Sequence, residues 1–153
     1  MAISGFSEHF SFEELTDSSH KELVAKNRNE AMEYLIAGKR LSKLLESIRT
    51  YFGSSITVSS GFRGAEVNKA VGSKAKSSAH LRFEAADIIP SGISVEAAFD
   101  KLRADKAKFG DLRKVILEKV GSKKWLHVEV KMSASEPQKF YLTTDGSTYK
   151  EVV

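Results

Sequence analysis

Two histidines and one aspartate are spaced in a way that could hold a metal ion. His80 follows a stretch rich in serine and lysine, Asp87 comes seven residues later within an apolar run, and His127 lies in a second apolar run. Two imidazoles and a carboxylate leave a fourth zinc position open for water, as catalytic zinc sites do. Zinc makes hydroxide available near neutral pH, which suits hydrolysis. On residue types alone, a histidine hydrogen-bonded within the core remains the simpler explanation.

Composition limits the other classes. The 153 residues include four histidines and no cysteine, which excludes disulfides, thiolate zinc sites, iron–sulfur clusters and cysteine nucleophiles. Hydrophobic residues make up 41% of the chain, enough for a core, and we expect a single domain over residues 1–153. No apolar run approaches the roughly 20 residues of a membrane-spanning helix, so we expect no membrane insertion. The first residues lack the pattern of a signal peptide, which predicts synthesis in the cytoplasm.

The charge is modestly basic. A net charge of +4 and a pI near 9.2 suit an acidic partner such as nucleic acid or an anionic cell wall. The lysines are scattered and form no block, so a solvated surface explains them more simply. We therefore expect no nucleic-acid partner.

The elements that must position these residues begin with helices. Ser11 and Glu14 form the pattern of a capping box at the start of a short helix. Apolar residues recur at spacings of three and four from about 29 to 52, which predicts one long helix ending at Gly53. Shorter helices are expected over residues 64–72 and 94–104, with a serine- and lysine-rich loop over 73–79.

Strand patterns alternate with and follow these helices. They cover residues 55–60, 84–89, 115–117, 125–130, 140–143 and 148–152. Gly121-Ser122 and Asp145-Gly146 are the expected hairpin turns. This order predicts an α+β fold, with N-terminal helices packed on a mainly antiparallel sheet that carries the His-Asp-His site.

Several segments resemble the zinc D-alanyl-D-alanine carboxypeptidase family. This family includes phage cell-wall endopeptidases and vancomycin-resistance dipeptidases, and it shares its metal site with hedgehog signalling domains. The matching segments are Ser59-Ser60-Gly61-Phe62-Arg63, Asn68 to Gly72, Ser78-Ala79-His80, Glu84-Ala85-Ala86-Asp87-Ile88, Ile116-Leu117-Glu118 and Trp125-Leu126-His127-Val128. The opening Ser7 to Leu15 resembles the start of small phage and bacterial members. The resemblance covers roughly residues 5–130, and the tail from Lys131 lies outside it.

The resemblance implies roles for individual residues. His80, Asp87 and His127 match the ligands of one Zn²⁺. Arg63 matches the arginine that polarises the scissile carbonyl or stabilises the oxyanion. Two further residues are candidates for substrate contact, Ser78 and Trp125; a loop cap explains the serine equally well, and a place in the core or cleft wall explains the tryptophan.

The general base is matched less directly. Some relatives carry a glutamate three residues before the last histidine, where this chain has Lys124. Others carry it six residues before that histidine, on the preceding strand. Glu118 lies nine residues before His127, which implies a connection longer by three residues.

Hairpin geometry decides whether Glu118 can serve. If the loop around Gly121 has two or four residues, Glu118 pairs with Trp125 and shares a face with His127. A three-residue loop would place them on opposite faces. Glu129, on the same face as His127, is the reserve candidate.

The resemblance implies a zinc metallopeptidase of the carboxypeptidase or endolysin-type endopeptidase kind, acting on bacterial cell-wall peptidoglycan. It further implies a phage-encoded protein that acts at the cell wall or in the virion, with other virion proteins as partners. The alternative is a virion or cell-wall binding module of the same fold that retains zinc without turnover. Phe83, where the family has glycine, and the displaced glutamate favour this alternative.

Overall fold

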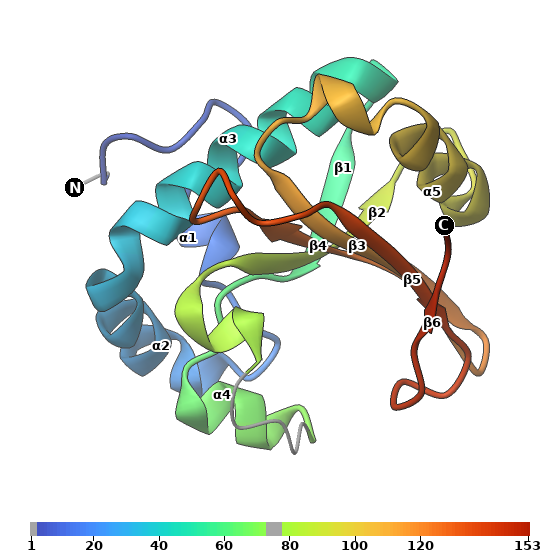
Figure 1. The fold of residues 1–153 in the computed structure, drawn as a ribbon. Helices are drawn as coiled ribbons and strands as arrows, with labels where there is room; N and C mark the ends of the chain where they lie inside the picture. The colour runs from blue at the N-terminus through green and yellow to red at the C-terminus, as the bar shows by residue number, and fades with distance from the viewer. Residues whose placement is uncertain (1–2, 73–77) are drawn as a thin grey trace.

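The computed structural model describes residues 3–72 and 78–153 (Figure 1). The expected loop over 73–79 therefore lies outside the described residues except at its end. The α-helices are α1 (Phe12–Leu15), α2 (Val24–Ala31), α3 (Leu35–Phe52), α4 (Ala65–Ala70) and α5 (Val95–Ala104). Short 3₁₀ turns are η1 (Lys21–Leu23), η2 (Met32–Tyr34), η3 (Ala79–Arg82) and η4 (Lys106–Lys108). The strands are β1 (Ile56–Ser60), β2 (Ala85–Pro90), β3 (Leu112–Val120), β4 (Lys123–Val130), β5 (Lys139–Thr143) and β6 (Lys150–Glu151).

The strands form one six-stranded sheet in the order β1-β2-β4-β3-β5-β6. Its neighbours are antiparallel except β3 and β5, which run parallel. The expected α+β fold with a mainly antiparallel sheet is therefore confirmed. The parallel pair was not expected, because adjacent strands in a sequence of short turns are usually joined as antiparallel hairpins.

The two faces of the sheet differ in polarity, because successive side chains on a strand point to opposite faces. Leu126, Val128 and Val130 of β4 enter the hydrophobic core. The residues that alternate with them, Trp125, His127 and Glu129, line a cleft on the other face. The neighbouring strands follow the same rule, with Ala86, Ile88, Val115, Leu117 and Phe140 in the core and Asp87, Lys114, Ile116, Glu118 and Tyr141 at the cleft.

Helices α3 and α5 cover the apolar face. Both contact β2 and β4, and in Figure 1 both lie on the same side of the sheet. Leu41, Leu45 and Ile48 of α3 are fully buried, in agreement with the predicted apolar stripe. Among the described residues no helix combines the length and apolar character needed to cross a membrane.

The predicted helix over 29–52 is interrupted. The chain leaves helical geometry at Tyr34, where φ is −122° and ψ is 28°. Before this point, the side-chain amide of Asn27 donates to the carbonyls of Thr16 (2.8 Å) and Phe62 (3.0 Å), which attaches α2 to the end of α1 and to the turn after β1. After it, α3 follows its apolar stripe along the sheet. These two attachments require a change of direction that periodicity alone does not reveal.

Phe83 occupies the core, where its ring is fully buried. The residue caps η3 in the left-handed conformation, with φ of 60° and ψ of 32°. Its ring packs against Phe6, Phe12 and Phe62, with centroid distances of 6.1, 6.3 and 5.4 Å. A bulky residue at this position therefore supplies the tight turn and points away from the cleft, which it does not narrow.

Candidate metal centre

Three side chains from different elements converge on the cleft. His80 lies on η3, while Asp87 of β2 is paired directly with His127 of β4. Asp87 Oδ1 lies 3.3 Å from His80 Nε2 and 3.1 Å from His127 Nδ1. Each of the three offers one ligand atom, and these atoms all lie within 4.8 Å of one another. This arrangement is a possible metal site.

His80 is positioned by the backbone around it. The Ser78 hydroxyl accepts a hydrogen bond from the His80 backbone N–H at 3.2 Å and so caps η3. The His80 ring is buried, and its Nδ1 lies 2.7 Å from the Gly61 carbonyl oxygen. Because a carbonyl only accepts, Nδ1 carries the proton and Nε2 presents a lone pair. That Nε2 is buried, makes no hydrogen bond among the described residues and faces Asp87 Oδ1 at 3.3 Å, as expected of two ligand atoms directed at one metal position.

His127 is held between two carboxylates. Its Nδ1 faces Asp87, and its Nε2 lies 2.7 Å from Glu129 Oε2. Burial would lower the pKa of His127, but the hydrogen bonds to Asp87 and Glu129 outweigh it and raise the pKa to about 9. Burial would likewise raise the pKa of Asp87, yet the two histidines hold it well below its ordinary value. A metal ion at this site would displace the Nδ1 proton of His127. The donor set would then be one ionised carboxylate and two oriented imidazoles, which fits zinc.

Glu118 lies beside the triad on β3. Residues 120 and 123 are paired across Gly121, which has φ of +62°, so the hairpin loop has two residues. Glu118 consequently pairs with Trp125 and shares the face of His127, as expected for a loop of two residues. The indole Nε1 of Trp125 donates to Glu118 Oε2 at 3.0 Å. Burial and the charge of Asp87 raise the pKa of Glu118, against smaller opposing effects of His127, Trp125 and Arg63.

Arg63 follows β1 and also lines the cleft. Its backbone N–H donates to the His80 carbonyl at 3.0 Å, which ties the turn after β1 to η3. The side chain is half-buried, and its Nε finds no hydrogen-bond partner in the described part of the chain. Burial lowers the pKa of Arg63, while the charges of Asp87 and Glu118 raise it. The guanidinium therefore remains a donor facing the cleft.

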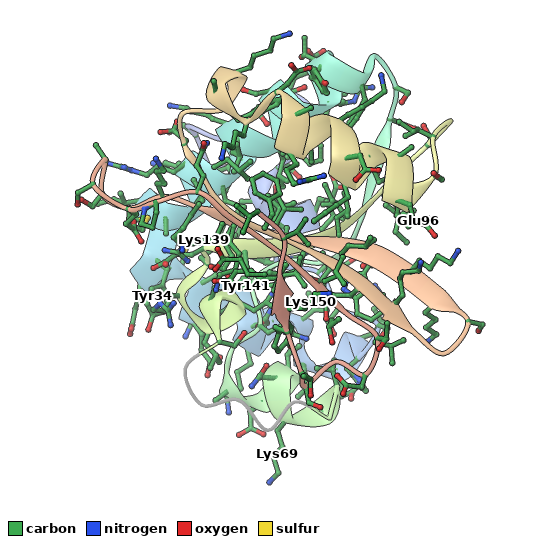
Figure 2. All side chains as sticks on the ribbon, turned by 45° about the vertical axis from the view of Figure 1, so that its right-hand side comes forward. Tyr34, Lys69, Glu96, Lys139, Tyr141 and Lys150 are labelled. Carbon is green, nitrogen blue, oxygen red and sulfur yellow. The ribbon has the colours of Figure 1, made fainter. Side chains whose placement is uncertain are left out.

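The cleft has a volume of about 780 Å³, and the triad and both flanking residues line it. Ser78 and Trp125 also line it, so both sequence-derived candidates for substrate contact lie at the cavity. The β5–β6 segment adds lining residues that the sequence did not indicate: Tyr141, Gly146, Ser147 and Tyr149. Figure 2 views the molecule from the side of β5 and β6, with Tyr141 and Lys150 labelled. No motif marks these residues, because they reach the cleft only through the parallel pairing of β5 with β3.

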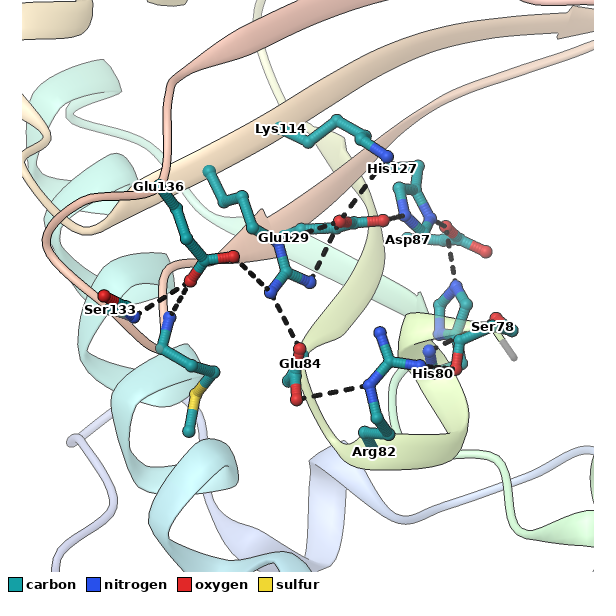
Figure 3. A network of polar contacts seen from close by, with 12 residues as sticks. Ser78, His80, Arg82, Glu84, Asp87, Lys114, His127, Glu129, Ser133 and Glu136 are labelled. Atoms are coloured by element: carbon teal, nitrogen blue, oxygen red, sulfur yellow. Dashed lines mark hydrogen bonds and ion pairs between the residues drawn. The ribbon is translucent and has the colours of Figure 1, made fainter.

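A polar network extends from His127 to residues at the ends of the central strands β2, β3 and β4 (Figure 3). Arg113 Nη2 lies 3.0 Å from Glu129 Oε1, and Arg113 Nη1 lies 2.8 Å from Glu84 and 3.3 Å from Glu136. Burial would raise the pKa of Glu129, but the hydrogen bond from His127 and the nearby positive charges lower it to about 2. Sequence spacing gave no signal for this network, because its members lie far apart in the chain.

The comparisons with known proteins agree with this geometry. No curated protein matches the chain. The family model of peptidase M15 matches residues 8–129, which is well over half of the chain. This family is zinc-dependent, and its match spans the triad, Arg63 and Glu118 but not β5 and β6. The chain belongs to the peptidase M15 family, the family of the zinc D-alanyl-D-alanine carboxypeptidases.

Proposed function

We propose that this protein is a zinc peptidase that hydrolyses amide bonds in the peptide part of bacterial peptidoglycan. One observation carries the proposal: the ligand atoms of His80, Asp87 and His127 converge within 4.8 Å at a cleft that also holds Glu118 and Arg63. Family membership supports zinc and the peptidase class. The peptidoglycan substrate follows from the family rather than from the cleft.

The residues divide the chemistry between them. Zinc, when bound, supplies Lewis-acid activation of water and of the scissile carbonyl. Glu118 takes the proton of the attacking water and returns it to the leaving amine, and a raised pKa suits a group that must both accept and release a proton near neutral pH. Trp125 fixes one Glu118 oxygen, leaving the other for the reaction. Arg63 donates to the oxygen on which negative charge develops.

Glu118 is a better base than Glu129 because its carboxylate is available. The Glu129 oxygens are already engaged, Oε2 by His127 at 2.7 Å and Oε1 by Arg113 at 3.0 Å. Glu129 also contacts Nε2 of His127, the ring nitrogen opposite the one that faces Asp87. It thus contacts the side of the imidazole that faces away from Asp87, whereas the only hydrogen bond to the Glu118 carboxylate among the described residues comes from Trp125.

The finer assignment rests on the resemblance. It favours a bond flanked by D-amino acids and a phage lysis or virion-associated protein, because the Ser7 to Leu15 segment resembles small phage members. A net charge of +4 would favour residence on anionic wall polymers.

The test combines metal analysis with wall digestion. Purified protein is expected to carry about one zinc per chain, and His127→Ala to lose it. Wild-type protein should clear purified cell walls in a zymogram, and the clearing should stop when a chelator removes zinc.

The base is tested by Glu118→Gln, which should retain zinc and the fold but hydrolyse about 10²–10⁴-fold more slowly. The matched control is Glu8→Gln, because Glu8 is an exposed glutamate outside the cleft. Mass spectrometry of the released muropeptides identifies the bond.

The alternative, a wall-binding module without turnover, is one outcome of the same test. Zinc-loaded wild-type protein that binds walls but releases no muropeptide would establish it. The two features that favoured it have another explanation, because the Phe83 ring lies in the core and the two-residue hairpin brings Glu118 to the cleft.

A further inference from the structure

The contact between His127 and Glu129 bears on which ring nitrogen of His127 is free to bind a metal ion. A histidine can bind zinc through either ring nitrogen, and the other nitrogen then carries a proton. Here Nε2 faces Glu129 Oε2 at 2.7 Å, and Nδ1 faces the triad. Both side chains are buried, with residue exposures of 8% for His127 and 7% for Glu129, so water competes little for this hydrogen bond.

Glu129 is itself fixed. Its Oε1 accepts from Arg113 Nε at 3.1 Å and lies 3.0 Å from Nη2, which is a two-pronged contact with a planar guanidinium. Lys114 Nζ lies 3.8 Å from the same oxygen. Such contacts leave the carboxylate little freedom to turn away from His127.

Arg113 is anchored from two further directions. Glu84, at the start of β2, and Glu136, in the segment after β4, both pair with its Nη1. Glu136 is held in turn, because its Oε1 accepts from the backbone N–H groups of Met132 and Ser133 at 2.7 and 2.9 Å. Glu136 lies beyond the segment matched by the peptidase family.

We propose that Glu129 is a positioning residue, which holds His127 as the Nε2–H tautomer so that the Nδ1 lone pair is directed at the metal. Arg113 holds Glu129 in this role. The proposal rests on the metal site of the proposed function. Without the acceptor at Nε2, the imidazole can rotate or adopt the other tautomer, and part of the free energy of zinc binding is then spent on ordering the ring.

The first measurement uses the wild-type protein. Long-range ¹H–¹⁵N correlation spectra of the zinc-loaded, ¹⁵N-labelled chain report which nitrogen of each histidine is protonated. We expect a protonated Nε2 and a metal-bound Nδ1 for His127. Metal bound through Nε2 would overturn the proposal, and this result does not depend on any variant folding.

The second measurement compares zinc affinities by competition with a chromophoric chelator at one pH. Glu129→Ala is expected to weaken zinc binding about 10–100-fold, and Glu129→Gln, which keeps an acceptor for Nε2–H, by less than about tenfold. Glu8→Ala is the matched control, because it removes an exposed glutamate that contacts neither Arg113 nor His127, and its affinity should stay within about threefold of the wild type.

The outcomes separate the two proposals. Equal affinities for wild type and a folded Glu129→Ala would overturn the positioning role, as would a loss in Glu129→Gln or Glu8→Ala as large as that in Glu129→Ala. Zinc retained in full by His127→Ala would instead show that the metal site itself is wrong.

Discussion

Replacing Phe83 by glycine has two opposing effects on the free energy of unfolding. The residue has φ of 60°, a conformation that costs an L-residue about 1–2 kcal/mol and that glycine adopts freely. The ring is fully buried among three other phenylalanines, and deleting such a ring costs about 3–5 kcal/mol. The lost packing is the larger of the two, so glycine should destabilise the protein.

The alanine variant separates the two contributions. Phe83→Ala loses the ring but keeps a Cβ, and hence the strained backbone, so we expect it to lower the free energy of unfolding by about 3–5 kcal/mol. Phe83→Gly loses the same ring, but its backbone adopts the positive φ without strain, which raises the free energy of unfolding. The extra conformational freedom of glycine in the unfolded chain lowers that free energy and offsets part of the gain. It should be about 0.5–1 kcal/mol more stable than Phe83→Ala and about 2–4 kcal/mol less stable than the wild type.

Urea unfolding followed by circular dichroism measures all three free energies. The control repeats the comparison at Ser47, an exposed position inside α3, where Ser47→Gly should be less stable than Ser47→Ala by about 1 kcal/mol. The order of alanine and glycine is thus expected to reverse between the two sites. A Phe83→Gly protein as stable as the wild type would refute the claim that the ring holds the core, and one less stable than Phe83→Ala would refute the backbone argument.

Three further predictions concern other parts of the molecule. Gly61→Ala would force a Cβ against the backbone carbonyl oxygen of Leu15 in α1, so it should destabilise the fold by about 1–3 kcal/mol in urea unfolding. Gly110→Ala, with open space around the Cβ, should change stability little. Hydrogen bonds from Lys124 and Lys119 of the β3–β4 hairpin lower the pKa of Glu96 from 4.5 to about 2. The ionised Glu96 carboxylate therefore stabilises the fold fully above about pH 5, and this stabilisation is lost as the pH falls toward 2. The difference in Tm between wild type and Glu96→Gln should therefore shrink over that range, and a difference that grows instead would contradict the assignment. Tyr149→Ala should raise KM for soluble muropeptides about 2–10-fold with kcat unchanged, because the Tyr149 ring lines the cleft. Tyr34 is an aromatic residue outside that cleft, so Tyr34→Ala should leave KM unchanged.

Local patterns in the sequence predicted those parts of the site that depend on local geometry. Alternation along a strand puts Trp125, His127 and Glu129 on one face whatever the rest of the fold does. A two-residue turn at Gly121 then determines the register that brings Glu118 to the same face. These relations involve neighbouring residues, so spacing along the chain carries them.

The parts that the sequence did not predict depend on contacts between distant segments. Glu84 and Glu136 both pair with the guanidinium of Arg113, yet the spacing of these residues in the sequence does not indicate that they meet. The direction of the Phe83 ring was open for a similar reason, because three aromatic side chains from separate segments form its surroundings. The break at Tyr34 likewise arises from contacts of α2 with the end of α1 and with the turn after β1.

The parallel strand β5 has a consequence for aggregation. It covers the open hydrogen-bonding edge of β3, a strand whose nine residues include Leu112, Val115, Ile116 and Leu117. The sheet then ends in β6, which has only two residues, Lys150 and Glu151, both charged. A short, charged outer strand is a poor template for a neighbouring molecule, whereas a long apolar edge invites strands of other molecules to add to it. A fragment trimmed to the segment that matches the peptidase family would expose that edge, and we expect it to self-associate where the longer chain stays monodisperse.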